Sequence, residues 1–253
     1  MIASDHPGLL VDRASPRCRG GALFAFICVG KTGRVIISLD LDGTLIDSPF
    51  PAALRVAADL VAPDRPDEFR AAVSARHREL VAAGGVAGYD WTAIVGEIAV
   101  DYGVATAPDM AALVADVAPM ATRLLEPTAL RLLGEHRARD TRLVIVTNGF
   151  RCFQEQAIRA VGLDSVVDEV ITADDVHAAK PDRAIFAAAY YGHAGPRIHV
   201  GDRHDHDVIG GHDSGARTIL IADKAPTELH PQPDAVVSTV VEALEMVDAI
   251  TWS

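Results

Sequence analysis

The stretch LDLDGTLID, residues 39–47, directly follows a short apolar run and places two carboxylates two positions apart. The run itself, Val35 to Leu39 (VIISL), is β-branched and apolar, which is the pattern of a strand buried on both faces of a parallel sheet. Because side chains alternate along an extended segment, Asp40 and Asp42 can point toward the same site. Gly43 frees the backbone for a turn. The stretch therefore predicts a strand end that carries a pair of acidic groups.

Five further apolar runs have the same character. They occupy residues 143–147 (LVIVT), 166–171 (VVDEVI), 198–200 (IHV), 218–221 (TILI) and 235–237 (AVV). Most of them are separated by segments of helical pattern, and strands that alternate with helices form right-handed crossover units. We therefore expect an α/β fold with a doubly wound parallel sheet.

A different pattern lies between the first two expected strands. From about Pro51 to Leu125 there is no strand signal, and so long a segment is not a bare loop. Apolar residues recur there at helical spacing, in three groups: Phe69, Val73 and Leu80; Trp91, Ile94, Val95, Ile98 and Tyr102; Met110, Leu113, Val114 and Val117. These helices either extend the main core or form an all-helical insertion over the carboxyl edge of the sheet, where open α/β sheets bind ligands.

We expect the second arrangement, which divides the chain into three parts. Residues 35–50 and 126–253 form a core domain, and residues 51–125 form the inserted helical domain. Residues 1–34 form an irregular N-terminal extension. Asp47 falls where the chain leaves for the insertion, and we assign it no chemistry.

Composition restricts the partners. The chain of 253 residues has a net charge of −12 and is 49% hydrophobic, a balance typical of globular proteins. Nucleic acids and anionic membranes attract cationic surfaces, so we expect neither as a partner. No apolar run approaches the ~20 residues of a membrane-spanning helix. Three cysteines without a CxxC pair indicate neither a disulfide framework nor a zinc site, which suits a cytoplasmic protein. The oligomeric state is left open.

Polar residues follow four of the expected elements, and in a parallel sheet such positions converge on one crevice. They are Asp40 and Asp42, then Thr147 and Asn148, then Lys180, and finally Asp202 and Asp207. Thr147 with its neighbouring amides can bind phosphate oxygens, and Lys180 can neutralise their charge. The carboxylates of Asp40, Asp202 and Asp207 are oxygen ligands of the kind that Mg²⁺ prefers.

This set of motifs, in this order, resembles the haloacid dehalogenase superfamily, from Val35 to the final helix. The resemblance implies that Asp40 attacks the substrate and becomes an aspartyl-phosphate. It implies that Asp42 is the general acid and base, and that the backbone carbonyl of Asp42 binds the metal.

The same resemblance implies roles for the remaining positions. Thr147, Asn148 and Lys180 bind the substrate phosphate, and Asp40, Asp42, Asp202 and Asp207 hold the cofactor Mg²⁺. The position of the helical insertion is similar to that of the type 1 cap of subfamily IA, which admits small, soluble phosphoesters.

Residue content narrows the chemistry within the superfamily. Dehalogenases of this type have no acid at the position of Asp42, since a halide needs no proton. Phosphonate-cleaving relatives use a lysine in the cap, whereas the lysines here are Lys31, Lys180 and Lys224, none of which lies in the insertion. We therefore expect a Mg²⁺-dependent phosphatase that hydrolyses a small phosphomonoester. The alternatives are a phosphosugar mutase and a catalytically silent binding protein on the same fold.

The sequence indicates the type of reaction more specifically than the substrate. The stretch TNGFRCFQ, which ends at Gln154, resembles relatives that hydrolyse nucleoside monophosphates; a sugar phosphate is the other expectation. Candidates for contacting the leaving group are Arg76, His77, Arg78, Tyr89 and Trp91. Two histidines, His204 and His206, could indicate a preference for a transition metal. We expect instead that His206 supports the metal ligands without binding the metal itself. For His177 and His199 we expect structural roles.

Overall fold

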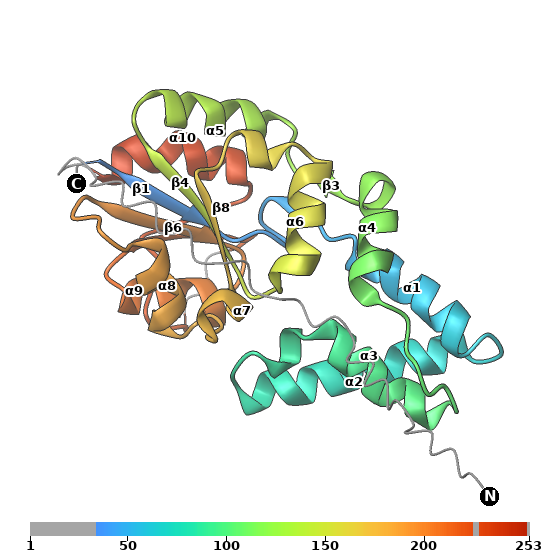
Figure 1. The fold of residues 1–253 in the computed structure, drawn as a ribbon. Helices are drawn as coiled ribbons and strands as arrows, with labels where there is room; N and C mark the ends of the chain where they lie inside the picture. Colours follow the sequence, from blue (N-terminus) through green and yellow to red (C-terminus); the bar gives the residue numbers. More distant parts are fainter. Residues whose placement is uncertain (1–33, 225–227, 252–253) are drawn as a thin grey trace, which may run out of the picture.

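The computed structural model describes residues 34–224 and 228–251. The predicted extension, residues 1–34, therefore lies outside the described residues except for Arg34. Figure 1 shows a sheet flanked by helices and, beside it, a second group of helices. Within the described residues, no helix combines the length and the apolar character needed to cross a membrane.

The sheet is parallel, with the strand order β5-β4-β1-β6-β7-β8. Its strands are β1 (Ile36–Leu39), β4 (Arg142–Thr147), β5 (Glu169–Thr172), β6 (Arg197–Gly201), β7 (Arg217–Ile221) and β8 (Ala235–Val237). The predicted doubly wound sheet is thus confirmed. The run at 166–171 contributes a strand only from Glu169, because Val166 and Val167 still bond back to the 3-10 turn at Leu163.

Alternate residues of each strand face opposite layers of helices. Leu143 and Ile145 of β4 pack in a cluster with α5 (Thr128–Ala138) and α10 (Val240–Thr251). Val144 and Val146 pack instead with α8 (Arg183–Ala189). Figure 1 shows these helices on the two sides of the sheet, together with α7 (Ala173–Val176) and α9 (Ile209–Asp213). Burial on both faces explains why the strands read as continuous apolar runs.

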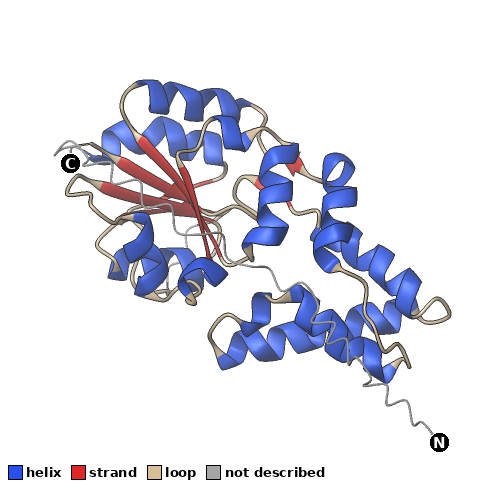
Figure 2. Ribbon diagram, viewed as in Figure 1, coloured by secondary structure: helices blue, strands red, loops and turns tan. Residues whose placement is uncertain are grey.

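The inserted segment is helical, as predicted. It contains α1 (Phe50–Val61), α2 (Pro66–Ala83), the 3-10 turn η1 (Ala87–Tyr89), α3 (Trp91–Asp101) and α4 (Met110–Ala121). These helices bury a cluster of their own, in which Phe69, Ile94 and Met110 have no exposed surface. Figure 2 shows the strands of the sheet gathered on one side of the molecule and the inserted helices on the other.

Two features of the insertion differ from the predicted pattern. A two-stranded antiparallel ribbon of β2 (Ile46–Asp47) and β3 (Arg123–Leu124) joins the insertion to the core, although no strand was predicted between residues 51 and 125. Strands of two residues are too short to produce an alternating signal. Helix α1 was also not among the predicted helices. The limits of the three predicted domains stay predictions.

Helix α6 (Arg151–Ala160) belongs to the core by sequence position but touches the insertion. Phe153 is buried in the same cluster as Phe69 and Ile94. One helix therefore packs against the inserted helices while it follows directly after the strand end at Thr147.

Candidate functional site

The site lies where β1, β4 and β6 end. Strand β1 lies between β4 and β6, so the residues that follow these three strands share one edge of the sheet. Asp40 follows β1, Thr147 ends β4 and Asp202 follows β6. The predicted convergence of these positions is therefore what the topology produces.

Lys180 is the centre of a buried group of charges. Its side chain is 2% exposed, and Nζ lies 2.5 Å from Oδ1 of Asp40 and 2.7 Å from Oδ1 of Asp207. Burial alone would lower the pKa of Lys180, but the two carboxylates raise it. The ammonium group therefore stays charged and compensates two acids that have little access to water.

Asp207 is fixed from several directions. Oδ1 also accepts a hydrogen bond from Nε2 of His199 at 3.0 Å, and Oδ2 accepts one from the backbone N–H of Arg203 at 3.0 Å. Although burial opposes it, the charges and hydrogen bonds of Lys180 and His199 lower the pKa of Asp207. This carboxylate is therefore ionised and held in place.

His199 was predicted only as a structural residue, and its contact with Asp207 was missed. Nδ1 of His199 lies 2.8 Å from Oγ of Ser38, which in turn lies 2.7 Å from the hydroxyl of Tyr190. A neutral imidazole that accepts from Ser38 donates from Nε2 to Asp207. Oγ of Ser38 also donates to the carbonyl oxygen of Ile198 at 3.1 Å. The contacts therefore hold the ring of His199 with Nε2 toward Asp207.

Asp42 occupies a different environment from Asp40. Nε2 of Gln154 lies 2.6 Å from Oδ2 of Asp42, whereas Oδ1 is buried without a hydrogen-bond partner. Burial, and then the charge of Asp40, raise the pKa of Asp42, while hydrogen bonds from Gln154 and Ser48 oppose the rise. A carboxyl group with a raised pKa and one free oxygen is suited to proton transfer.

Three carboxylates can bind a cation together. Asp40, Asp202 and Asp207 each offer an oxygen atom, and these atoms lie within 4.8 Å of one another. Burial, followed by the charges of Asp40 and Asp207, raises the pKa of Asp202 to about 7. Such mutual repulsion among hard oxygen donors is relieved by a divalent cation, so the residues fit Mg²⁺. Among the described residues, this group includes neither His204 nor His206.

Gly43 makes room for Asp202. A Cβ atom at this position would lie 2.7 Å from Oδ2 of Asp202, and the backbone has a φ of +86°. Both the approach of the carboxylate and the left-handed backbone require glycine. The DGT turn therefore places Asp202 close to the end of β1.

Asn148 connects the loop after β4 with two neighbours. Oδ1 accepts a hydrogen bond from the backbone N–H of Lys180 at 2.6 Å, and Nδ2 lies 2.9 Å from the hydroxyl of Tyr89. Tyr89 belongs to η1, so this contact joins the inserted helices to the core. Asn148 thus positions the backbone at Lys180 in addition to any contact with a substrate.

Three of the other predicted residues of the insertion make contacts within the insertion itself. Arg76 pairs with Glu79 and Glu97, and the ring of His77 stacks on Trp91 with centroids 4.5 Å apart. Arg78 is exposed. Only Tyr89 among these candidates has a recorded hydrogen bond to a predicted site residue.

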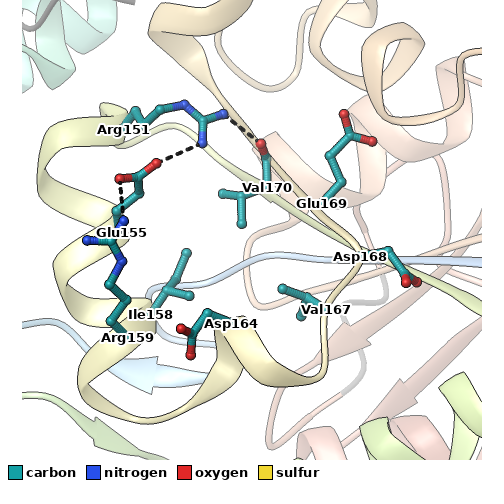
Figure 3. Close-up of a pocket in the computed structure, with 9 residues that line it drawn as sticks. All are labelled: Arg151, Glu155, Ile158, Arg159, Asp164, Val167, Asp168, Glu169 and Val170. Carbon is teal, nitrogen blue, oxygen red and sulfur yellow. Dashed lines mark hydrogen bonds and ion pairs between the residues drawn. The ribbon is translucent and has the colours of Figure 1, made fainter. Parts of the chain in front are cut away.

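A surface pocket of about 250 Å³ is separate from this site. Figure 3 shows that it is lined by side chains of α6 and of the edge strand β5. Arg151 in this pocket bonds to Glu155 and to the carbonyl of Val170. None of the predicted site residues lines it. Its charged groups are engaged in ion pairs, such as those of Glu155 with Arg151 and Arg159.

Comparison with known families defines the class. A family model described as haloacid dehalogenase-like hydrolase matches residues 36–215. The chain belongs to this family, and its helical insertion and parallel core fit the predicted subfamily.

The chain matches curated proteins only over part of their length and at about 30% identity. The chain is 31% identical over 96 residues to pyrimidine 5′-nucleotidase YjjG of Escherichia coli, a match covering 36% of this chain and 42% of that protein. It is 29% identical over 121 residues to human N-acylneuraminate-9-phosphatase, covering 44% and 48%. The chain thus spans about half the length, or less, of these curated relatives.

Solved structures show the same fold. A HAD phosphatase from Thermococcus onnurineus has a TM-score of 0.64 at 23% identity, covering 85% of this chain and 97% of that one. An L-2-haloacid dehalogenase from Xanthobacter autotrophicus has a TM-score of 0.58 at 19% identity, covering 85% and 98%. Because one fold hosts different reactions, these likenesses describe the architecture alone.

Proposed function

We propose that the protein is a Mg²⁺-dependent phosphatase that hydrolyses a small-molecule phosphomonoester through an aspartyl-phosphate on Asp40. The observation that carries the proposal is the buried pair of Asp40 and Lys180 beside Asp42. A carboxylate nucleophile, a fixed cation and a second carboxyl group with a raised pKa are the parts that this reaction needs.

The reaction has two steps. An oxygen of Asp40 forms a bond to phosphorus as the bond to the ester oxygen breaks, and Asp42 gives its proton to the leaving oxygen. Asp42 then takes a proton from water, which attacks phosphorus, releases inorganic phosphate and restores Asp40. The covalent intermediate divides one difficult step into two easier ones.

Charge stabilisation accounts for most of the barrier reduction. A positioned acid or base contributes only ~10² to 10⁴ in rate, whereas hydrolysis of phosphate monoesters requires up to ~10²¹. The proposed phosphate-binding groups are the ammonium group of Lys180, the hydroxyl of Thr147 and the backbone N–H of Asn148. They are fixed before the substrate arrives, so no reorganisation is needed as charge develops.

The metal is proposed to bind at the carboxylates of Asp40, Asp202 and Asp207 and at the backbone carbonyl of Asp42. When bound, Mg²⁺ supplies positive charge that offsets the charge of the phosphoryl group. Both oxygens of Asp207 already accept hydrogen bonds, so Asp202 has the carboxylate that is freer to turn toward a cation.

We propose that the substrate is a nucleoside monophosphate or a sugar phosphate, so that the leaving group is a nucleoside or a sugar. The inserted helices carry a stacked group of rings near η1, in which Phe50 and Trp91 have centroids 3.8 Å apart and His77 stacks on Trp91. Tyr89 extends from the same region to Asn148. The names of the curated relatives include a nucleotidase and a sugar-acid phosphatase, which supports testing both classes.

The test is release of phosphate from p-nitrophenyl phosphate, with Mg²⁺ and with a chelator, by the wild-type protein and by Asp40→Asn. We expect Mg²⁺-dependent release that Asp40→Asn reduces at least ~10³-fold. Asp47→Asn is the matched control, because Asp47 is exposed. A panel of nucleotides and sugar phosphates then identifies the ester. Equal, negligible release by the wild type and Asp40→Asn on every ester would contradict the proposal.

A further inference from the structure

Gln154 is a buried amide whose contacts are not explained by packing alone. It lies on α6 with 6% of its surface exposed. Nε2 is 2.6 Å from Oδ2 of Asp42 and 3.2 Å from Oγ1 of Thr147. The amide therefore bridges two groups that follow different strands.

The two protons of this amide restrict what each partner can do. An amide nitrogen only donates, so Oδ2 of Asp42 must accept, and in a protonated carboxyl group the carbonyl oxygen is the stronger acceptor. The proton of the acid form then belongs on Oδ1, which is buried without a hydrogen-bond partner. Gln154 thus selects the oxygen of Asp42 that is left to exchange a proton.

The same reasoning applies to Thr147. A hydroxyl oxygen has two acceptor positions and one proton. Oγ1 of Thr147 accepts from Nε2 of Gln154 and from the backbone N–H of Gly149 at 3.2 Å. With both acceptor positions used, the hydroxyl proton is directed elsewhere and is available to a phosphate oxygen.

We infer that Gln154 is a positioning residue for the reaction. It holds Oδ2 of Asp42 so that Oδ1 faces the leaving oxygen, and it orients the hydroxyl of Thr147 as a donor. The inference rests on the proposed function, because it assigns Gln154 to the proton transfer of that phosphatase. Gln154 itself does not contact the substrate.

The surroundings of Gln154 favour a fixed side chain. A Cβ atom at Gly149 would lie 1.9 Å from Nε2 of Gln154, so the amide passes directly over the glycine. The preceding residue, Phe153, is buried among the inserted helices. Helix α6 is therefore fixed on one side by the insertion while Gln154 reaches the catalytic carboxyl group on the other.

A purely structural amide and a positioning amide have different kinetic effects. Loss of a structural contact lowers the rate for every ester by a similar factor. Loss of the orientation of a general acid lowers the rate most for leaving groups that need a proton, because a strongly acidic phenol departs without one. Dependence on the leaving group therefore separates the two roles.

The experiment measures kcat/KM for aryl phosphates whose phenols range from strongly to weakly acidic. This parameter is used because hydrolysis of the intermediate is common to all esters and affects kcat. The test variant is Gln154→Met, which keeps the length of the side chain and removes both donors. Gln156→Met is the matched control, since Gln156 lies on the same helix without a recorded side-chain contact to the site.

We expect Gln154→Met to lower kcat/KM by roughly 10- to 100-fold for phenyl phosphate and by only a few fold for p-nitrophenyl phosphate, a part of the usual effect of general acid catalysis. Gln156→Met should leave the dependence on the leaving group unchanged. Gln154→Asn is a second variant, which keeps a polar amide but is one methylene shorter, and it should show the same increased dependence.

An equal loss for all esters in an active, folded Gln154→Met or Gln154→Asn protein would overturn the inference and leave the phosphatase proposal intact. A wild-type protein that hydrolyses none of the esters would instead overturn the proposed function, and with it this role of Gln154. Thermal unfolding of each variant verifies the fold, and Gln154→Asn decides the outcome if Gln154→Met does not fold.

Discussion

Gly149 has no Cβ atom, and this leaves the space that the side chain of Gln154 occupies when it hydrogen-bonds to Asp42. A Cβ at residue 149 would also lie 2.6 Å from Cδ of Gln154, closer than side-chain carbons approach one another. The backbone of Gly149 has no positive φ in the structure, so an alanine here would clash with the amide of Gln154 without straining the backbone. The glycine of the TNG stretch is therefore coupled to the glutamine five residues later.

Gly149→Ala should reproduce the effect of Gln154→Met without altering Gln154 itself. The new methyl group displaces the amide from Oδ2 of Asp42, so kcat/KM should fall by roughly 10- to 100-fold for phenyl phosphate and by only a few fold for p-nitrophenyl phosphate. The comparison is with Gly134→Ala, whose Cβ would meet only Val166 at 3.9 Å. If Gly149→Ala shows the leaving-group dependence of the wild type, the clash does not control the acid.

Residue types at strand ends were predictable, whereas contacts between them were not. Asp40 and Asp42 could be selected because carboxylates that follow a buried strand rarely serve packing. Lys180 could be selected because it is the only lysine at a position of the predicted motifs. The bond from Gln154 to Asp42 joins segments 112 residues apart, and the bond from His199 to Asp207 depends on the side-chain conformations of two residues near the end of β6. Neither side-chain conformations nor contacts between distant segments can be read from a sequence pattern.

At the scale of elements, the 3-10 turn η1 connects the inserted helices to the core. The hydroxyl of Tyr89 accepts a hydrogen bond from Nδ2 of Asn148, and burial raises the pKa of Tyr89, so the phenol stays neutral. A single hydrogen bond between two packed units biases the arrangement in which they are close. We therefore expect this hydrogen bond to favour the arrangement in which η1 lies against the core.

Tyr89→Phe should weaken substrate binding more than it slows chemistry. One neutral hydrogen bond contributes about 0.5–1.5 kcal/mol, so we expect KM to rise by roughly 2- to 10-fold while kcat changes less. Tyr102→Phe removes a hydroxyl from a ring that packs against Phe69 within the insertion and should leave KM unchanged. An unchanged KM in Tyr89→Phe, or an equal rise in Tyr102→Phe, would show that the contact does not act on binding.

Elements with several periods were predictable, and shorter ones were not. Helices α2, α3 and α4 repeat their apolar positions over three or more turns, and this periodicity is long enough to be recognised in the sequence. The β2–β3 ribbon has two residues in each strand, so its pairing is decided by the ends of the insertion meeting in space. The joint between insertion and core is consequently visible only in the structure.

At the scale of the whole molecule, the acidic site lowers stability when no cation is bound. The pKa of Asp202 is raised to about 7, first by burial and then by the charges of Asp40 and Asp207. Between its ordinary value and about 7, the folded state binds a proton at Asp202 that the unfolded state has lost. Stability therefore falls as pH rises through this window, because the native state binds more protons. Burial similarly raises the pKa values of Asp40 and Asp42.

Asp202→Asn should reduce this loss of stability in the absence of metal. Asparagine does not titrate, so the free energy of unfolding in a chelator should fall less between pH 5 and pH 8 than in the wild type. One group contributes at most about 1.4 kcal/mol per pH unit, and partial exposure of Asp202 to solvent reduces that value. Urea unfolding at both pH values measures the difference. Asp205→Asn, at a more exposed position of the same loop, should retain the pH dependence of the wild type.

Adding Mg²⁺ at pH 8 completes the test of the same carboxylates. A cation that binds only the folded protein stabilises it by mass action, by about 2.7 kcal/mol at a hundredfold excess over its dissociation constant. The wild-type protein should therefore regain at pH 8 the stability that it loses in chelator, and Asp205→Asn should do so as well. Asp202→Asn lacks a ligand and should gain much less at the same concentration. If Mg²⁺ stabilises Asp202→Asn as strongly as the wild type, the cation binds elsewhere and the three carboxylates are not its site.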